Sequence, residues 1–187
     1  MLSLLIFFAA LCLRLIYIYE IADNPFFIAP VVDAHTYSLQ ARIIATGNWL
    51  DYSPGPFWQP PLYPWFLGAL HYLAEEHFFL VARIVQAIFG ALSCTLLYLV
   101  GKELFNCKVG MLAALALALY GPAIYFDAEL LPASMAVLLL LLVLRILLRA
   151  SAKNSARLWF VAGLLLGVAA LNVPTILILL PGLVLWA

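Results

Sequence analysis

The sequence is poor in charge: Asp, Glu, Lys and Arg make up only 10% of its 187 residues, whereas 67% are hydrophobic. A soluble domain typically carries about a quarter charged residues. Together with a mean hydropathy of +1.12, this composition predicts an integral membrane protein whose surface meets lipid. The formal net charge of zero gives no sign of a strongly basic surface, so no nucleic-acid partner is expected.

Cysteine is also scarce. The three cysteines stand singly at Cys12, Cys94 and Cys107, and the first two lie inside apolar runs, so no disulfide framework is expected.

The first apolar run, residues 2–19, lacks a basic amino-terminal segment and a convincing small-residue cleavage site. We therefore interpret it as a retained helix and not as a cleaved signal.

Long apolar runs are what the sequence does contain, and they predict an all-α, polytopic transmembrane bundle of about six spans. The runs are residues 2–19, 84–100, 109–126, 130–148 and 158–187. The last run would be about 45 Å long as one helix, which is too long for an ordinary span. We divide it at Asn172-Val173-Pro174, because proline interrupts a helix.

The run 61–74 is too short to cross about 30 Å of hydrocarbon comfortably. It either spans or lies flat as a juxtamembrane helix, and loop charges distinguish the two. If it lies flat and the amino terminus is inside, the long loop 20–82 and the turn 127–129 place most of the acids outside. The inside loops then hold Lys102, Lys108, Arg145, Arg149, Lys153 and Arg157. This arrangement follows the positive-inside rule, so we favour the flat orientation, with loop 20–82 extracytoplasmic.

A second juxtamembrane helix is predicted within loop 20–82. Helical character begins at Asp33, which is well placed as the N-cap, and ends at Gly47, which is well placed as the C-terminal stop. Apolar side chains recur on one face of this segment, which would let it rest on the membrane surface. Rigid turns are expected at Pro54-Gly55-Pro56 and over 58–64.

A loop of this kind suits chemistry on a lipid-linked substrate. When a sugar moves from a polyprenyl phosphate to a hydroxyl, the departing phosphate needs charge stabilisation, and the acceptor hydroxyl must lose a proton to a base. The candidate base is Asp33, and a divalent metal is a possible further source of positive charge. The candidate phosphate partners are Arg14, Arg42 and Arg83. Because an arginine inside an apolar helix is unfavourable, Arg14 is expected to have a partner.

Several motifs occur in a particular order along the chain. They are Arg14, Asp33-Ala34-His35-Thr36-Tyr37, Gly47-Asn48-Trp49, Gln59-Pro60-Pro61-Leu62-Tyr63-Pro64, Arg83-Ile84-Val85-Gln86, Tyr120-Gly121-Pro122, Asp127-Ala128-Glu129 and Leu171-Asn172-Val173-Pro174. Taken in this order, the chain resembles the amino-terminal part of family 39-like, GT-C fold glycosyltransferases, which are relatives of protein O-mannosyltransferases and aminoarabinose transferases.

The resemblance implies a multi-pass enzyme of the bacterial inner membrane that acts on the extracytoplasmic face. Such an enzyme transfers a sugar, with inversion, from a polyprenyl-phosphate carrier to a hydroxyl of a protein, lipid or glycan acceptor. It implies that Asp33 is the catalytic base and that Glu129 assists, with Asp127 in reserve. The substrate- and donor-binding candidates are Arg14, His35, Tyr37, Arg42, Gln59 and Arg83. Residues 1–187 correspond to the amino-terminal part of the module, with a carboxy-terminal region absent.

Two positions depart from the family pattern. Many relatives carry a second carboxylate after the first aspartate, where this chain has Ala34, and Lys or His before the Pro-Pro pair, where it has Gln59. A neutral amide can donate a hydrogen bond to phosphate but cannot offset its charge.

Other interpretations stay open. Asp33 can serve as a helix cap, a role compatible with catalysis, and Glu129 can simply face water in a turn. A transporter or flippase component would also have many helices, and a noncatalytic assembly subunit is the other class of function.

Overall fold

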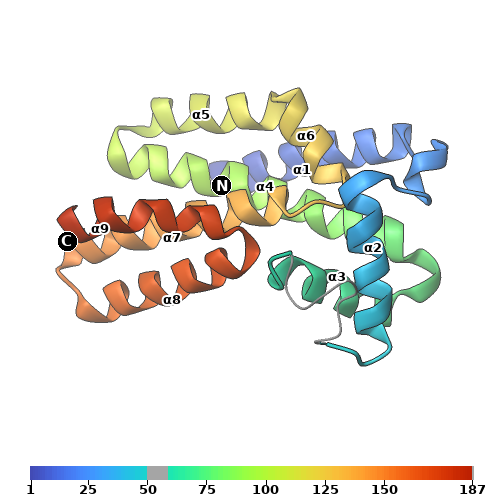
Figure 1. The fold of residues 1–187 in the computed structure, drawn as a ribbon. Coiled ribbons are helices and arrows are strands. Elements are labelled where there is room, and N and C mark those ends of the chain that lie inside the picture. Colours follow the sequence, from blue (N-terminus) through green and yellow to red (C-terminus); the bar gives the residue numbers. More distant parts are fainter. Residues whose placement is uncertain (50–58, 187) are drawn as a thin grey trace.

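A computed structural model of the chain describes residues 1–49 and 59–186 (Figure 1). The turn expected at Pro54-Gly55-Pro56 lies outside these residues. The described chain is helical and contains no strand. The α-helices are α1 (Leu2–Glu20), α2 (Val32–Ala45), α3 (Leu62–Leu73), α4 (Phe78–Leu104), α5 (Cys107–Leu119), α6 (Gly121–Ala128), α7 (Ala133–Lys153), α8 (Ala156–Asn172) and α9 (Leu180–Trp186). Three 3-10 helices are η1 (Pro25–Phe27), η2 (Glu75–His77) and η3 (Pro174–Leu179).

Among the described residues, three helical segments are long and apolar enough to cross a membrane: α1, η2 with α4, and α7. The bent pair α5 and α6 adds a fourth if it is counted as one span. Helix α8 and the segment from Pro174 to Leu183 are apolar but shorter. The structure therefore confirms an all-α, polytopic architecture, and the number of six spans stays a prediction.

Proline determines where two of the apolar runs break. The predicted span 109–126 is not one continuous helix, because the chain bends by 56° between α5 and α6. Tyr120 is extended there, and Pro122 has no backbone N–H to continue the helix. The division at Asn172-Val173-Pro174 is confirmed: α8 ends at Asn172, Val173 is extended, and η3 begins at Pro174.

Small residues let α1, α4 and α5 pack closely. Ala10, Ala91, Cys94 and Ala114 are all fully buried in one cluster that these helices share. At the turn between α4 and α5, a Cβ on Gly101 would lie 2.7 Å from the Gly110 Cα, so the two backbones touch. Close approach through small residues is a common way for helices to associate in a bilayer. The three cysteines are free, as their isolated positions predict.

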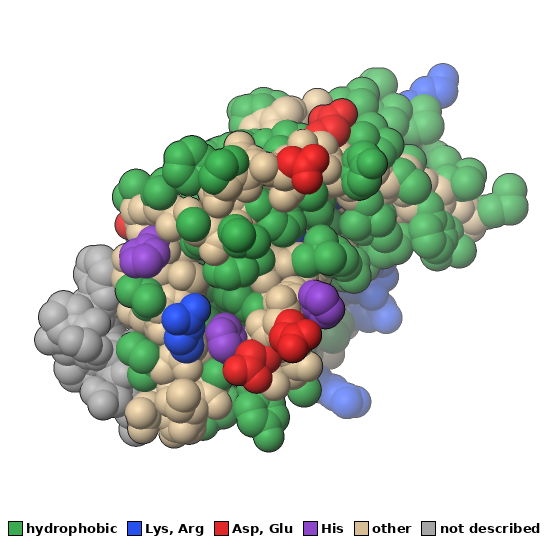
Figure 2. Space-filling view, turned by 90° about the vertical axis from the view of Figure 1, so that its right-hand side faces the viewer, with side chains coloured by type: hydrophobic (Ala, Val, Ile, Leu, Met, Phe, Trp, Pro, Cys, Tyr) green, Lys and Arg blue, Asp and Glu red, His purple; other side chains and the backbone are tan. Residues whose placement is uncertain are grey.

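The two ends of the bundle carry different charges. At one end, Glu103 of α4 lies within ion-pair distance of Arg145 and Arg149 of α7. At the other end, Ile18, Phe27, Ala87 and Ala128 pack together, which brings the end of α1, the start of α4 and the end of α6 side by side. Figure 2 shows acidic and histidine side chains gathered at this second end. The loops predicted to be inside thus share one end, and their orientation in the membrane stays a prediction.

Helices α2 and α3 form a pair at the second end (Figure 1). A Cβ on Gly68 would overlap the Ile44 side chain, so only glycine permits this close contact. Gly47 has φ +95° just after α2, which confirms it as the helix stop. The N-cap assignment of Asp33 is wrong: the N-cap is Val31 with no side-chain cap bond, and Asp33 is the second residue of the helix.

Candidate active site

Asp33 is exposed at the start of α2. The residue before it, Val32, has φ +54°, a left-handed conformation that strongly disfavours a β-branched side chain. Such backbone strain persists only where the surrounding structure enforces it, and it is frequent at active sites. Asp33 thus follows a strained residue at the start of α2, and its side chain is exposed.

One turn after Asp33, Tyr37 connects α2 to α3. The Tyr37 ring is buried and meets the Tyr63 ring edge-on, with centroids 4.9 Å apart and an interplanar angle of 90°. Burial, and then the negative charge of Asp33, raises the pKa of the Tyr37 phenol. Burial is also the main cause that raises the pKa of Tyr63 well above its usual value. Both phenols therefore remain protonated hydrogen-bond donors.

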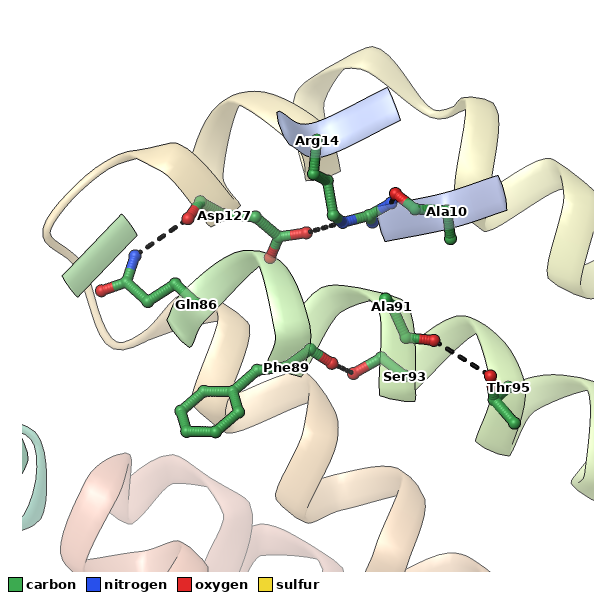
Figure 3. Close-up of polar contacts among 8 residues, drawn as sticks. All are labelled: Ala10, Arg14, Gln86, Phe89, Ala91, Ser93, Thr95 and Asp127. Carbon is green, nitrogen blue, oxygen red and sulfur yellow. Dashed lines mark hydrogen bonds and ion pairs between the residues drawn. The ribbon is translucent and has the colours of Figure 1, made fainter. Parts of the chain in front are cut away.

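Gln86 of α4 connects α3 to the turn that follows α6. The Tyr63 hydroxyl donates to Gln86 Oε1 at 2.5 Å. Gln86 Nε2 in turn donates to the backbone oxygens of Asp127 at 3.0 Å and Glu129 at 2.5 Å, the first of which is drawn in Figure 3. A side-chain amide has one acceptor end and one donor end, and Gln86 uses both. The position of Glu129 is therefore fixed by α4.

Arg14 has the partner that its place in an apolar helix requires. Its Nε donates to Asp127 Oδ2 at 2.6 Å and its NH1 group to the Ala10 oxygen at 3.1 Å (Figure 3). A Cβ on Gly90 would overlap both Asp127 Oδ2 and Arg14 Nε, so the absence of a side chain on α4 makes room for the ion pair. The prediction of a partner is confirmed, and a role of Arg14 in donor binding stays a prediction.

Arg83 is buried but keeps unused donor capacity. One of its terminal nitrogens donates to the Phe79 oxygen at 3.1 Å, and its guanidinium carbon lies 4.0 Å from the centroid of the Phe27 ring. Within the described chain, its Nε has no hydrogen-bond partner. Glu129, half-buried, interacts electrostatically with Arg83. A buried cation with a free donor beside a carboxylate is suited to bind a further polar group.

The remaining candidates are less closely grouped. His35 is exposed on α2. Gln59, just before α3, is half-buried, and its Oε1 is buried without a partner among the described residues. Arg42 is exposed and lies nine residues beyond Asp33 on α2, about 13 Å along the helix axis. The structure thus brings Arg83 and Glu129 together and connects them to Tyr37, but it separates Arg42 from Asp33.

Two residues of the site, Tyr63 and Gln86, were not among the predicted site residues. Both belong to the ordered motifs, and Gln86 follows Arg83 by three positions, which places the two on one face of a helix. That spacing was the available signal. In the described parts of the chain, no group of three or more His, Cys, Asp or Glu residues lies close enough to hold a metal ion.

These observations define an all-helical integral membrane protein with a polar site at one end of its bundle. A family model described as dolichyl-phosphate-mannose-protein mannosyltransferase matches residues 58–187, and the chain belongs to this family. It is therefore a membrane glycosyltransferase of the GT-C type. The matched residues include Gln59, Arg83 and Glu129 but not Asp33. No curated protein and no solved structure matches the chain.

Proposed function

We propose that the protein transfers a sugar from a polyprenyl-phosphate donor to an acceptor hydroxyl at the extracytoplasmic face of a bacterial inner membrane, with Asp33 as general base. The observation that carries this proposal is the buried Arg83 guanidinium, whose Nε lacks a partner within the described chain. A phosphate is the group that such a cation binds best, since charge-assisted hydrogen bonds to phosphate are strong and geometrically specific.

The contacts described above support placing Asp33 and Arg83 at one site. Asp33 lies one turn from Tyr37, which packs against Tyr63, and Tyr63 donates to Gln86, one turn from Arg83 on α4. The route from carboxylate to guanidinium thus runs through three side chains at one end of the bundle.

The reaction assigns one task to each charged group. Asp33 accepts the proton of the acceptor hydroxyl, and the acceptor oxygen attacks the anomeric carbon of the sugar. The bond between this carbon and the phosphate oxygen breaks, and the phosphate leaves with the electron pair while Arg83 stabilises its charge. Glu129, whose negative charge acts on Arg83, helps to keep this guanidinium at the site. Attack opposite the leaving phosphate inverts the anomeric configuration.

The test measures transfer of labelled sugar in membranes that contain the protein. Polyprenyl-phosphate mannose is the first donor to try, because the description of the family names a mannosyl donor. Asp33→Asn should lower transfer by about 100-fold or more, because a general base contributes on the order of 10²–10⁴, at an unchanged amount of protein in the membrane. Asp23→Asn, another exposed acid of the same loop, should leave transfer unchanged.

Wild-type transfer by the Asp33→Asn variant would show that Asp33 is not the base. Arg83→Gln should weaken donor binding, and Arg83→Lys should restore it only in part, because lysine lacks the planar fork of donors. If the wild-type protein transferred no sugar from any polyprenyl-phosphate donor, the enzyme proposal would fail in favour of a noncatalytic assembly subunit.

A further inference from the structure

A polar cavity lies at the far end of the α2–α3 pair from Asp33. Its volume is about 540 Å³. The lining residues are Arg42, Ala45, Thr46, His71, Tyr72 and Glu75. They come from the ends of α2 and α3 and from the start of η2, so three successive elements enclose one hollow. The close contact at Gly68 and Ile44 sets the spacing of the two helices next to it.

The cavity contains one cation and one carboxylate that do not neutralise each other. Arg42 and Glu75 are both exposed, and neither forms an ion pair within the described chain. The Thr46 hydroxyl donates to the Ile43 oxygen at 2.7 Å, which leaves its lone pairs free to accept. The His71 ring is held against the Phe78 ring at 4.9 Å between centroids. A ligand that carries both a positive and a negative group would complement this set.

An apolar cavity of about 350 Å³ adjoins the polar one and shares Ala45 and Tyr72 with it. Ile44, Ala69 and Leu73 contribute to its wall. At its edge, the Trp65 indole donates to the Trp49 oxygen at 3.0 Å. Trp and Tyr favour the boundary between headgroups and acyl chains. A polar compartment that continues into an apolar one is the shape of a site for an amphipathic molecule.

We propose that the two cavities bind one phospholipid with an amine-bearing headgroup. The phosphate lies at Arg42 and the ammonium group at Glu75, and an acyl chain occupies the apolar cavity. This occupant differs from the sugar donor for two reasons. Arg42 is about 13 Å along α2 from Asp33, too far for the anomeric carbon of a bound donor. Glu75 would also repel a ligand that carries only negative charge. The inference does not rest on the proposed function.

The experiment is a lipid titration of the purified protein in detergent, with bound lipids counted by native mass spectrometry. Phosphatidylethanolamine should bind one molecule per protein, about tenfold more tightly than phosphatidylglycerol, which has the phosphate without the amine. Arg42→Gln should weaken the binding of both lipids by about tenfold. Glu75→Gln should weaken only phosphatidylethanolamine and so remove the preference.

Two controls make the outcome specific. Arg157→Gln removes an exposed arginine from the start of α8 and should change nothing. Asp33→Asn should also leave lipid binding unchanged, which separates this site from the transfer reaction. Equal binding of the two lipids by the wild type would overturn the proposal, as would unchanged phosphatidylethanolamine binding by Arg42→Gln. Displacement of the lipid by stoichiometric polyprenyl phosphate would instead assign the cavity to the donor.

Discussion

Arg14 on α1 and Asp127 on α6 form an ion pair at 2.6 Å, although 113 residues separate them in the sequence. Both side chains are almost completely buried, at 2% and 8% exposed. Two buried charges stabilise the fold only as a pair, because either one alone keeps its desolvation penalty without the compensating attraction. The pair also joins the first helix to the segment that precedes Glu129.

Asp127→Asn should therefore destabilise the protein by about 3 kcal/mol or more, since it leaves the Arg14 charge buried without a counter-charge. The measurement is unfolding in detergent. The double variant Arg14→Gln with Asp127→Asn should lose less than Asp127→Asn alone, because no unpaired charge remains. Additive losses in the two single variants and the double variant would contradict an energetically coupled pair.

Gly90→Ala should destabilise the protein by about 1–3 kcal/mol. The added Cβ would overlap both members of the Arg14–Asp127 pair, so the ion pair must shift or lengthen to make room for it. Gly163→Ala on α8 is the matched control, because a Cβ there meets no atom within 4 Å. The control should be neutral or slightly stabilising, as alanine favours a helix over glycine. Thermal unfolding in detergent compares the two variants, and equal effects would refute the steric explanation.

Tyr63→Phe should cost about 1–3 kcal/mol, because it leaves Gln86 Oε1 without its donor in a fully buried position. Tyr19→Phe, at a residue that is 82% exposed, should be neutral. Unfolding midpoints of both variants give the comparison. If Tyr63→Phe were as stable as the wild type, the hydrogen bond to Gln86 would not hold α3 in place.

Glu103→Gln should have a small effect, below about 1 kcal/mol, although Glu103 contacts two arginines. The distances from Glu103 Oε1 to Arg145 and Arg149 are 3.5 and 3.3 Å. Arg149 is 46% exposed and Glu103 34%, so water and salt screen the interaction. The loss should also shrink further at high salt, when unfolding is followed across a salt series. A loss as large as that of Asp127→Asn would show that this end is much less solvated.

Hydropathy and proline positions predict most of the helices, because both effects depend on a short stretch of sequence. An apolar run long enough to cross the membrane indicates a helix, and a proline ends it because proline lacks a backbone N–H. The break at Pro174 follows from the sequence for this reason. The break at Pro122 does not, because the apolar run 109–126 continues across it and the length suits one span. The N-cap of α2 lies two residues before the predicted Asp33, at Val31, since no local sequence pattern indicates the left-handed conformation of Val32.

The contacts of the site were less predictable than the helices. That Arg14 needs a partner follows from its apolar surroundings, but the choice of Asp127 depends on the bend between α5 and α6. The Tyr63–Gln86 hydrogen bond likewise depends on how α3 packs against α4. The positive charge of Arg42 makes it a phosphate-binding candidate in the sequence. Its distance from Asp33 follows only from the observed helix α2, which places the two residues at opposite ends.

The side-chain amide of Gln86 links three parts of the bundle, α3, α4 and the end of α6. It receives a hydrogen bond from Tyr63 of α3 and donates one to Asp127 at the end of α6 and one to Glu129 just after it. If the amide were rotated by 180°, its NH2 group would face the Tyr63 donor and its oxygen would face the two backbone oxygens. Sliding α3 along α4 by even one residue would break the Tyr63–Gln86 hydrogen bond, and shifting the end of α6 would break the other two. One side chain of α4 therefore ties both α3 and the Glu129 turn to the same point of the bundle, so a shift of α4 at Gln86 would strain both contacts at once.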